Sequence, residues 1–351
     1  MEFREIEETL PDAIAAHDFS GVIRIRHGDS VIYEGASGYA DRSNRIKNTL
    51  DTRFGIASGT KFFTALAIGK LIENGKLTLD TRLADVVDLG FPQYAPEITI
   101  QHLLTHTSGI PDYYDEEAVE DYDNFTVAVP WSELRGPRDY LAVFPEGPMK
   151  FTPGERFSYS NGGYIALGIV IEELSGRAYR DFVTEEILRA YGMARSGFFA
   201  FNKLPGETAF GYVEEDEGGW HTNIYNLPVI GASDGGMYTT VEDMTRLWDA
   251  FWANQILSPA MVTLFTKPYS HAASEGEHIY YGHGVWIYDD GAGVREDYIE
   301  GCDAGVSFRS GRNRARDLEI TVISNTTGGA WPILRAIDVC TRQHNPNDQM
   351  A

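Results

Sequence analysis

FGIASGTKFF, residues 54–63, places a serine and a lysine, Ser58 and Lys61, three positions apart in an otherwise apolar stretch. Apolar residues continue on nearly every side of this segment as far as Ile72, so the pattern predicts a central, buried helix. Gly75 is a natural end for that helix. Because residues three apart are neighbours on a helix, the side chains of Ser58 and Lys61 can meet in its first turns.

This pair is typical of a serine nucleophile with a neighbouring base. Free backbone N–H groups at a helix start favour negative charge, so an acyl adduct on Ser58 would have donors for its oxyanion. A lysine among phenylalanines loses solvation, which favours the neutral amine and suits Lys61 to accept the hydroxyl proton. The alternative is that Ser58 caps the helix while Lys61 extends its amine to the surface, and an isolated pair of this spacing favours that alternative.

A second polar group, Tyr159-Ser160-Asn161, lies in a turn before another apolar helix. A phenol near a lysine ammonium loses its proton more readily, so Tyr159 is a second candidate base or a proton relay. The amide of Asn161 can accept a hydrogen bond from the lysine and donate one to a substrate carbonyl. Taken alone, the triplet would be an ordinary aromatic and polar turn.

Strand-like alternation lies at both ends of the chain. A Gly-Asp turn signal between two alternating runs predicts a β-hairpin at about 21–40. Three more strand-like runs follow at 280–290, 296–310 and 318–327, and a last helix at 330–343. The segments between the two ends show helical spacing. The sequence therefore predicts an α+β fold in which one antiparallel sheet is assembled from both ends and a mainly helical domain is inserted.

We expect a sheet domain made of residues 1–75 and 225–345, a mainly helical domain at 76–224 and a tail at 346–351. The segment 112–149, which contains acidic, proline and aromatic residues, predicts a long surface loop. Its aromatic residues could form an apolar lid or acyl pocket, or could simply pack the loop; they are Tyr113, Tyr114, Tyr122, Phe125 and Trp131.

With both motifs in this order and spacing, the chain resembles the serine β-lactamase and penicillin-binding-protein superfamily, in particular its class C-like and esterase-like branch. Four further segments carry the resemblance: ITIQHLLTHTSGIPDY, FTPGERFSYSN, GASDGGMYTTVEDMTRL and GHGVW. The resemblance implies an antiparallel sheet of five or slightly more strands, flanked by helices, with the active site between the sheet and the helical domain. It also implies that Ser58 is the nucleophile, that Lys61 and Tyr159 transfer protons, and that Asn161 binds substrate.

The third motif of that superfamily is a strand carrying Lys-Thr-Gly or His-x-Gly, and its equivalent here is Ile299-Glu300-Gly301, followed by Cys302. The resemblance implies that Glu300, Gly301 and Cys302 contact substrate, with the backbone N–H of Cys302 in the oxyanion hole. Gly301 would let substrate approach the backbone closely. The basic residue is missing, which argues against efficient recognition of a β-lactam or D-Ala-D-Ala carboxylate. Asp303 or Tyr298 could point into the site instead.

The charge balance, 52 acidic against 29 basic residues, argues against nucleic-acid and anionic-membrane partners. The first residues are acidic where a signal peptide is basic, so we expect a cytoplasmic protein, or a periplasmic or extracellular one if a leader has been removed. The two cysteines lack metal-site spacing. His102 and His106 have the spacing of a zinc pair, but no glutamate stands between them, and we expect neither metal nor cofactor.

The expected function is hydrolysis of a small-molecule ester or amide through an acyl-enzyme, by a carboxylesterase or small amide hydrolase. The alternative is a penicillin-binding protein (a D-Ala-D-Ala carboxypeptidase) or a serine β-lactamase, with a β-lactam as substrate. A non-catalytic, penicillin-sensor-like binding module is a third reading, which the presence of Ser58, Lys61, Tyr159 and Asn161 together disfavours. The sequence specifies no oligomeric state.

Overall fold

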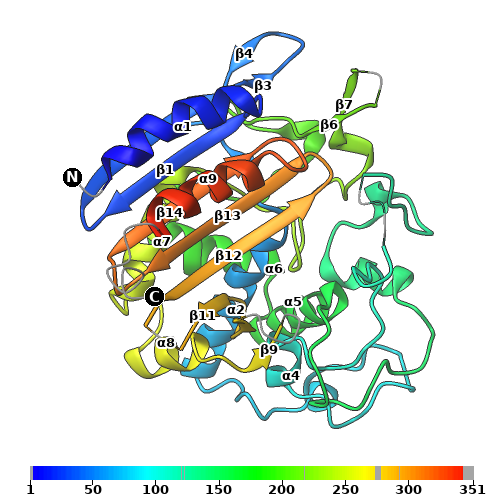
Figure 1. Ribbon diagram of the computed structural model, residues 1–351. Helices are drawn as coiled ribbons and strands as arrows, with labels where there is room; N and C mark the ends of the chain where they lie inside the picture. Colours follow the sequence, from blue (N-terminus) through cyan, green and yellow to red (C-terminus); the bar gives the residue numbers. More distant parts are fainter. Residues whose placement is uncertain are drawn as a thin grey trace.

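The computed structural model describes residues 3–119, 121, 123–216, 218–272, 278–291 and 293–342. Its largest element is an eight-stranded sheet in the order β2-β1-β14-β13-β12-β11-β10-β9 (Figure 1). Every neighbouring pair in it is antiparallel. The strands are β1 (Gly21–His27), β2 (Ser30–Ser37), β9 (Ser270–His271), β10 (Ile279–Tyr281), β11 (Trp286–Asp289), β12 (Arg295–Asp303), β13 (Val306–Asn313) and β14 (Leu318–Ser324).

The two ends of the chain meet inside this sheet, near its β2 edge, where β1 pairs with β14 from Gly21 opposite Ser324 to His27 opposite Leu318. The predicted α+β class, with one antiparallel sheet built from both ends, is confirmed. Three two-stranded sheets add to it: β3 (Tyr39–Asp41) with β4 (Ile46–Lys47), β5 (Phe54–Gly55) with β8 (Tyr238–Thr239), and β6 (Tyr212–Glu214) with β7 (Trp220–Thr222).

Two runs that we expected to form one strand each are hairpins, and that expectation was wrong. The run 280–290 contains β10 and β11, and the run 296–310 contains most of β12 and half of β13. The chain reverses at Gly284 and Gly305, whose φ angles of 78° and 70° are in the left-handed region that glycine adopts without strain. These reversals, together with the short β9, explain why the sheet has eight strands.

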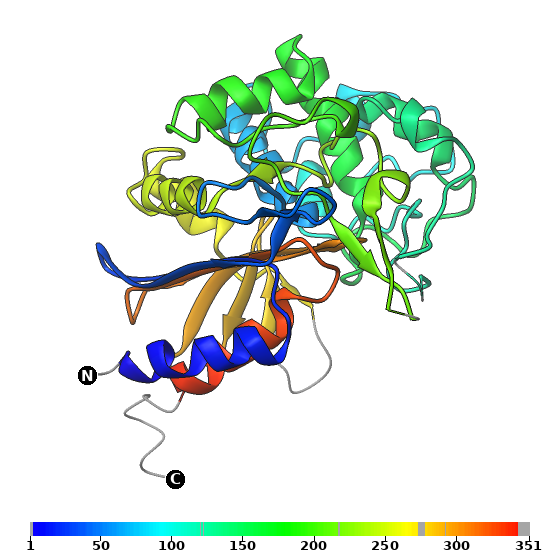
Figure 2. The same cartoon turned by 90° about the horizontal axis from the view of Figure 1, so that it is seen from above.

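The helices form a layer on each face of the sheet (Figure 2). One layer contains α1 and α9, which pack together at the two ends of the chain, and the other contains the helices of the middle of the sequence. The helices are α1 (Arg4–Ala16), α2 (Thr60–Glu73), α3 (Leu83–Val86), α4 (Ile100–Leu104), α5 (Asn161–Ser175), α6 (Tyr179–Val183), α7 (Val241–Trp252), α8 (Pro259–Phe265) and α9 (Ala330–Arg342). Short helical turns are η1 (Ala57–Gly59), η2 (Trp131–Glu133), η3 (Pro137–Val143), η4 (Thr184–Arg189), η5 (Phe201–Lys203) and η6 (Asn223–Tyr225).

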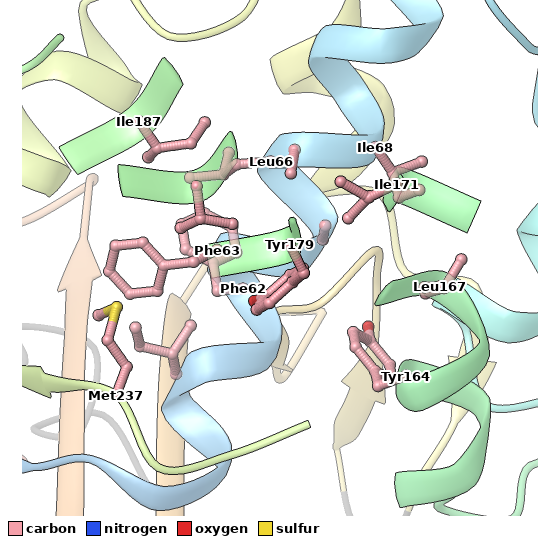
Figure 3. Close-up of a cluster of buried hydrophobic side chains, with 14 of the residues drawn as sticks. Phe62, Phe63, Leu66, Ile68, Tyr164, Leu167, Ile171, Tyr179, Ile187 and Met237 are labelled. Carbon is pink, nitrogen blue, oxygen red and sulfur yellow. The ribbon is translucent and has the colours of Figure 1, made fainter. Parts of the chain in front are cut away.

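Each face of the sheet has its own core because successive side chains of a strand point to opposite faces. On β1, Ile23 and Ile25 belong to the core under α1 and α9, whereas Val22 belongs to the larger core on the opposite face. In the larger core, α2 lies against α5 and α6, as Figure 3 shows for Phe63, Leu66 and their neighbours. The predicted central, buried helix after Ser58 is confirmed, and the chain turns at Gly75 with φ 67°.

The predicted domain boundaries remain a prediction, and the tail at 346–351 lies outside the described residues. Among the helices of the described residues, none has the length and apolarity needed to cross a membrane.

The β10–β11 turn buries a histidine, and this burial makes stability depend on pH. His283 lies between the rings of Phe265 and Tyr269, fully buried, and burial lowers its pKa from 6.5 to about 4. Below pH 6.5 the unfolded chain therefore binds a proton on this ring, whereas the folded chain binds it only when the pH falls to about 4. The stabilisation due to the neutral ring is complete above pH 6.5 and is lost as the pH falls toward 4.

We predict that wild-type protein loses about 2 kcal/mol more stability between pH 7 and pH 5 than a His283→Gln variant does. Urea unfolding of both proteins at the two pH values measures this difference. The difference between the two proteins isolates His283, because both keep every other titrating group. Equal pH dependence of the two proteins would show that His283 is not the group responsible.

Candidate active site

Ser58 lies in η1, the turn that connects β5 to α2. Ala57 precedes it with φ 45°, a left-handed conformation that is strained for a residue with a side chain. Two hydrogen bonds to the Ala57 carbonyl hold this turn, one from the Thr60 hydroxyl at 2.7 Å and one from the Gly236 N–H at 3.2 Å. The turn leaves Ser58 partly exposed while its neighbours are buried.

Lys61 is 1% exposed, and its Nζ contacts three oxygens. They are Ser58 Oγ at 2.9 Å, Asn161 Oδ1 at 2.7 Å and the Asp234 carbonyl at 2.7 Å. Burial lowers the pKa of Lys61, and the nearby carboxylates, Asp234 and Glu116 foremost, oppose that shift. The structure thus brings the predicted serine and lysine into direct contact.

The arrangement at Nζ suits a neutral amine as well as an ammonium. The Asn161 Oδ1 and the Asp234 carbonyl can only accept hydrogen bonds, so two N–H groups serve them in either state. A neutral amine then directs its lone pair at the third neighbour, Ser58 Oγ. This is the geometry in which a lysine accepts a proton from a serine hydroxyl.

Tyr159 lies against the same pair. The Ser58 side chain interacts with its hydroxyl, and Lys61 Nζ is 4.9 Å from its ring centroid. Burial and the carboxylates of Glu116 and Glu300 raise the pKa of Tyr159 well above 10. The expectation that Lys61 would make this phenol easier to ionise was wrong, because desolvation and the two carboxylates outweigh a lysine whose own charge is disfavoured. Tyr159 is therefore a neutral hydroxyl at ordinary pH.

The ring of Tyr159 is held by His106, which sequence reasoning had placed in a possible zinc pair. The His106 ring centroid is 4.2 Å from that of Tyr159, and its Nδ1 accepts the N–H of Ser160 at 3.0 Å. Burial lowers the pKa of His106 well below 6.5, so the ring is neutral. His102 instead accepts the Thr99 N–H at the start of α4.

Asn161 is the first residue of α5, and its position depends on Asp112, which sequence reasoning missed. The carboxylate of Asp112 accepts the backbone N–H groups of Asn161 and Gly162 at the helix start. The amide nitrogen of Asn161 donates to the Tyr114 carbonyl at 3.0 Å, which leaves its oxygen facing Lys61. The only signal for this role in the sequence was the position of Asp112 within GIPDY.

Gly301 brings strand β12 against the turn that contains Ser58. A Cβ atom at this position would lie 2.3 Å from the Ile56 carbonyl oxygen and 2.7 Å from the Ser58 nitrogen, so only glycine allows the approach. From Ile299 to Asp303, β12 pairs with β13 on one side, while its ladder with β11 covers only Arg295 to Tyr298. Among the described residues no strand pairs with the other edge of this part of β12, so it is open to a substrate backbone.

Glu300 and Cys302 alternate with Gly301 along β12 and do not line the cavity beside Ser58. Glu300 forms an ion pair with Arg309 of β13 at 2.9 Å, and Arg309 also lies 4.2 Å from the centroid of the Tyr298 ring. The strand motif lacks a basic residue, but the neighbouring strand supplies one. The Cys302 thiol contacts the Thr327 carbonyl, and burial raises its pKa to about 12, so it remains protonated.

A cavity lies beside Ser58. Its empty volume, including the part that is open to solvent, is about 850 Å³. Five described aromatic residues of the predicted loop line the cavity, together with three from further along the chain; they are Tyr113, Tyr114, Phe125, Trp131, Tyr140, Phe199, Phe201 and Tyr238. Tyr122 lies outside the described residues. The prediction of a surface loop at 112–149 was wrong in part, because Leu134, Tyr140 and Phe144 belong to the larger core.

Comparison with known proteins agrees with this architecture. The family model described as Beta-lactamase matches residues 3–337. Penicillin-binding protein 4* of Bacillus subtilis (strain 168) is 29% identical over 289 residues, which are 77% of this chain and 60% of that protein. Protein flp of Staphylococcus aureus (strain N315) is 30% identical over 257 residues, 69% of this chain and 48% of that protein. The chain thus spans only about half to three fifths of the length of these curated relatives.

Among solved structures, a penicillin binding protein from Bacillus halodurans is 41% identical, with a TM-score of 0.89 over 94% of this chain and 99% of that one. A D-amino acid amidase from Ochrobactrum anthropi SV3 is 22% identical, with a TM-score of 0.79 over 98% of this chain and 100% of that one, a likeness of fold alone. These matches confirm the predicted β-lactamase/transpeptidase-like fold. With a family model that matches nearly all of its length, the chain belongs to the Beta-lactamase family.

Proposed function

We propose that the protein is a serine hydrolase that cleaves an ester or amide through an acyl-enzyme on Ser58. The observation that carries this proposal is the contact of Lys61 Nζ with Ser58 Oγ, while two pure acceptors occupy the other side of the amine. A lysine that only extended its amine to the surface would be exposed, whereas Lys61 is 1% exposed. The family match supports the same chemistry.

In acylation, Ser58 Oγ attacks the carbonyl carbon and its proton passes to neutral Lys61. The carbonyl oxygen becomes an oxyanion, for which the backbone N–H groups of Ser58 and Cys302 are the candidate donors. The bond to the leaving group then breaks; Tyr159, a neutral hydroxyl, donates its proton to the departing oxygen or nitrogen and takes up the proton held by Lys61. Water attacks the acyl-enzyme in the second half, which releases the acid and restores the Ser58 hydroxyl.

A penicillin-binding protein or serine β-lactamase is the second candidate. The 41% identity to a penicillin binding protein and the position of Arg309 beside β12 favour it. Against it stands the ion pair of Arg309 with Glu300, which already neutralises the cation that a substrate carboxylate would need.

We predict that a short-chain 4-nitrophenyl ester acylates wild-type Ser58 and that a Ser58→Ala variant loses at least about a thousandfold in turnover. Mass spectrometry of the intact protein, followed by peptide mapping, identifies the acylated residue. The same measurement with a penicillin separates the two candidates, since a persistent penicilloyl group on Ser58 would favour the penicillin-binding protein. Full turnover by Ser58→Ala would refute both.

We predict that kcat/KM rises with pH as Lys61 loses its proton, with a midpoint below the ordinary lysine value of 10.5 because burial lowers its pKa. A Lys61→Arg variant keeps its charge at every accessible pH and should lose about a hundredfold or more in the rate of acylation. Stopped-flow detection of released 4-nitrophenol across pH 6 to 10 measures both effects. A Lys61→Arg variant that retained the wild-type rate and pH profile would exclude Lys61 as the base.

We predict that Tyr159→Phe slows acylation by about tenfold to a hundredfold but leaves the midpoint of the pH profile near that of the wild type. The reason is that the raised pKa of Tyr159 keeps it neutral while Lys61 titrates. Loss of the rising limb in this variant would instead assign the titration to Tyr159.

A further inference from the structure

The cavity beside Ser58 is acidic. Asp234, before β8, and Asp303, at the end of β12, both line it. None of the described residues that line it is a lysine, arginine or histidine. Lys61 does not line the cavity, and its amine is already hydrogen-bonded to three oxygens. An acyl group with a carboxylate would therefore meet two carboxyl groups and no free cation among the described residues that line the cavity.

Asp234 and Asp303 belong to two segments that contact η1, the turn that contains Ser58, from different sides. A Cβ atom on Gly235, next to Asp234, would lie 3.6 Å from the Ala57 carbonyl carbon. Asp303 follows Gly301 by two residues on β12 and so projects from the same face of the strand, the face that approaches the Ser58 nitrogen. Both residues thus line the cavity beside the turn that contains Ser58.

Lys61 favours the ionised form of both carboxyl groups, but its amine forms an ion pair with neither. The Tyr113 hydroxyl donates to the Asp234 carboxylate, but no described side chain forms a hydrogen bond or ion pair with the Asp303 carboxylate. Burial raises the pKa of Asp303 to about 7, and the carboxylates of Glu116 and Asp234 act in the same direction against Lys61. A cation bound beside Asp303 would favour its ionised form.

The half of the substrate that enters the cavity is the acyl half. Tyr159, the proposed proton donor to the leaving group, does not line the cavity. The leaving group therefore departs on the Tyr159 side, and the cavity with its aromatic wall receives the acyl group. Aromatic faces also attract cations and apolar side chains.

We propose that the acyl group transferred to Ser58 carries a protonated amine, held by Asp303 and Asp234, beside an apolar or aromatic side chain that packs on the wall of the cavity. The substrate class is an amide or ester of an amino acid with a free amino group. This inference rests on the proposed function, because it assumes that Ser58 is acylated.

Boronic acids test the inference without requiring turnover. The boron accepts Ser58 Oγ to form a tetrahedral adduct, and the hydroxyl proton passes to Lys61. Three matched compounds differ only at the amine: 1-amino-2-phenylethylboronic acid, its N-acetyl derivative and 2-phenylethylboronic acid, each chiral compound as both enantiomers. Titration calorimetry measures the three dissociation constants with the wild-type protein.

We predict that one enantiomer of the free amine binds about tenfold or more tightly than both neutral compounds, because its charge is paired in a partly desolvated site. An Asp303→Asn variant should lose most of this preference, and Asp234→Asn part of it. Asp29→Asn is the matched control, since its side chain is fully exposed in the turn between β1 and β2 and it should keep the wild-type ratio.

Two results would overturn the inference in different ways. If the neutral compounds bind as tightly as the amine and form the Ser58 adduct, the proposed function stands and the amine requirement falls. If no boronic acid binds and no activated ester acylates Ser58, the proposed function falls and the inference falls with it.

Discussion

The hydrogen bonds at the amine of Lys61 connect three distant parts of the chain, and the active site depends on them. The lysine belongs to α2, Asn161 begins α5, and the Asp234 carbonyl belongs to the segment before β8. A lysine buried without acceptors would be strongly destabilising, so these partners are what allows α2 to be buried on all sides. The same partners orient the amine toward Ser58. Stability of the central helix and reactivity of the serine thus have a common origin.

The network continues beyond these groups into the segment that walls the cavity. Asn161 is fixed by the Tyr114 carbonyl, and Asp112 holds the start of α5. A displacement of residues 112–116 would therefore be transmitted to Lys61 through a single side chain, that of Asn161. On the other side of Ser58, Gly301 belongs to β12, which is hydrogen-bonded into the large sheet. Ser58 thus lies between a strand of the sheet and a segment linked to Lys61, so the proposed proton transfer would respond to binding in the cavity.

The sequence predicted the local parts of this structure better than the distant ones. Three-residue spacing and apolar residues on all sides are properties of a single helix. The sequence therefore predicted the buried helix and the pair of Ser58 and Lys61. The family resemblance supplied Tyr159 and Gly301. The hairpins at Gly284 and Gly305 were missed because a glycine inside an alternating run resembles a strand residue until its φ angle is known.

The electrostatics of the site were the least predictable part. The pKa of Tyr159 is raised by burial and by the carboxylates of Glu116 and Glu300, which lie far from it in the sequence. Asp234 and Asp303 were not identified as a pair for the same reason, since 69 residues separate them and only the folded chain brings both to one cavity. Local patterns carry no information about such encounters.

The pairing of β1 with β14 has a consequence for biosynthesis. The partner strand of β1, residues 318–324, is synthesised roughly 290 residues after the hairpin of β1 and β2 begins to form. At about 5–20 residues per second, the inner edge of β1 stays unpaired for roughly 15 to 60 seconds. An exposed strand edge is a template for pairing with other chains. The nascent protein must therefore shield this edge while the residues between β2 and β14 are made, and chains that stop before β14 would release it unprotected.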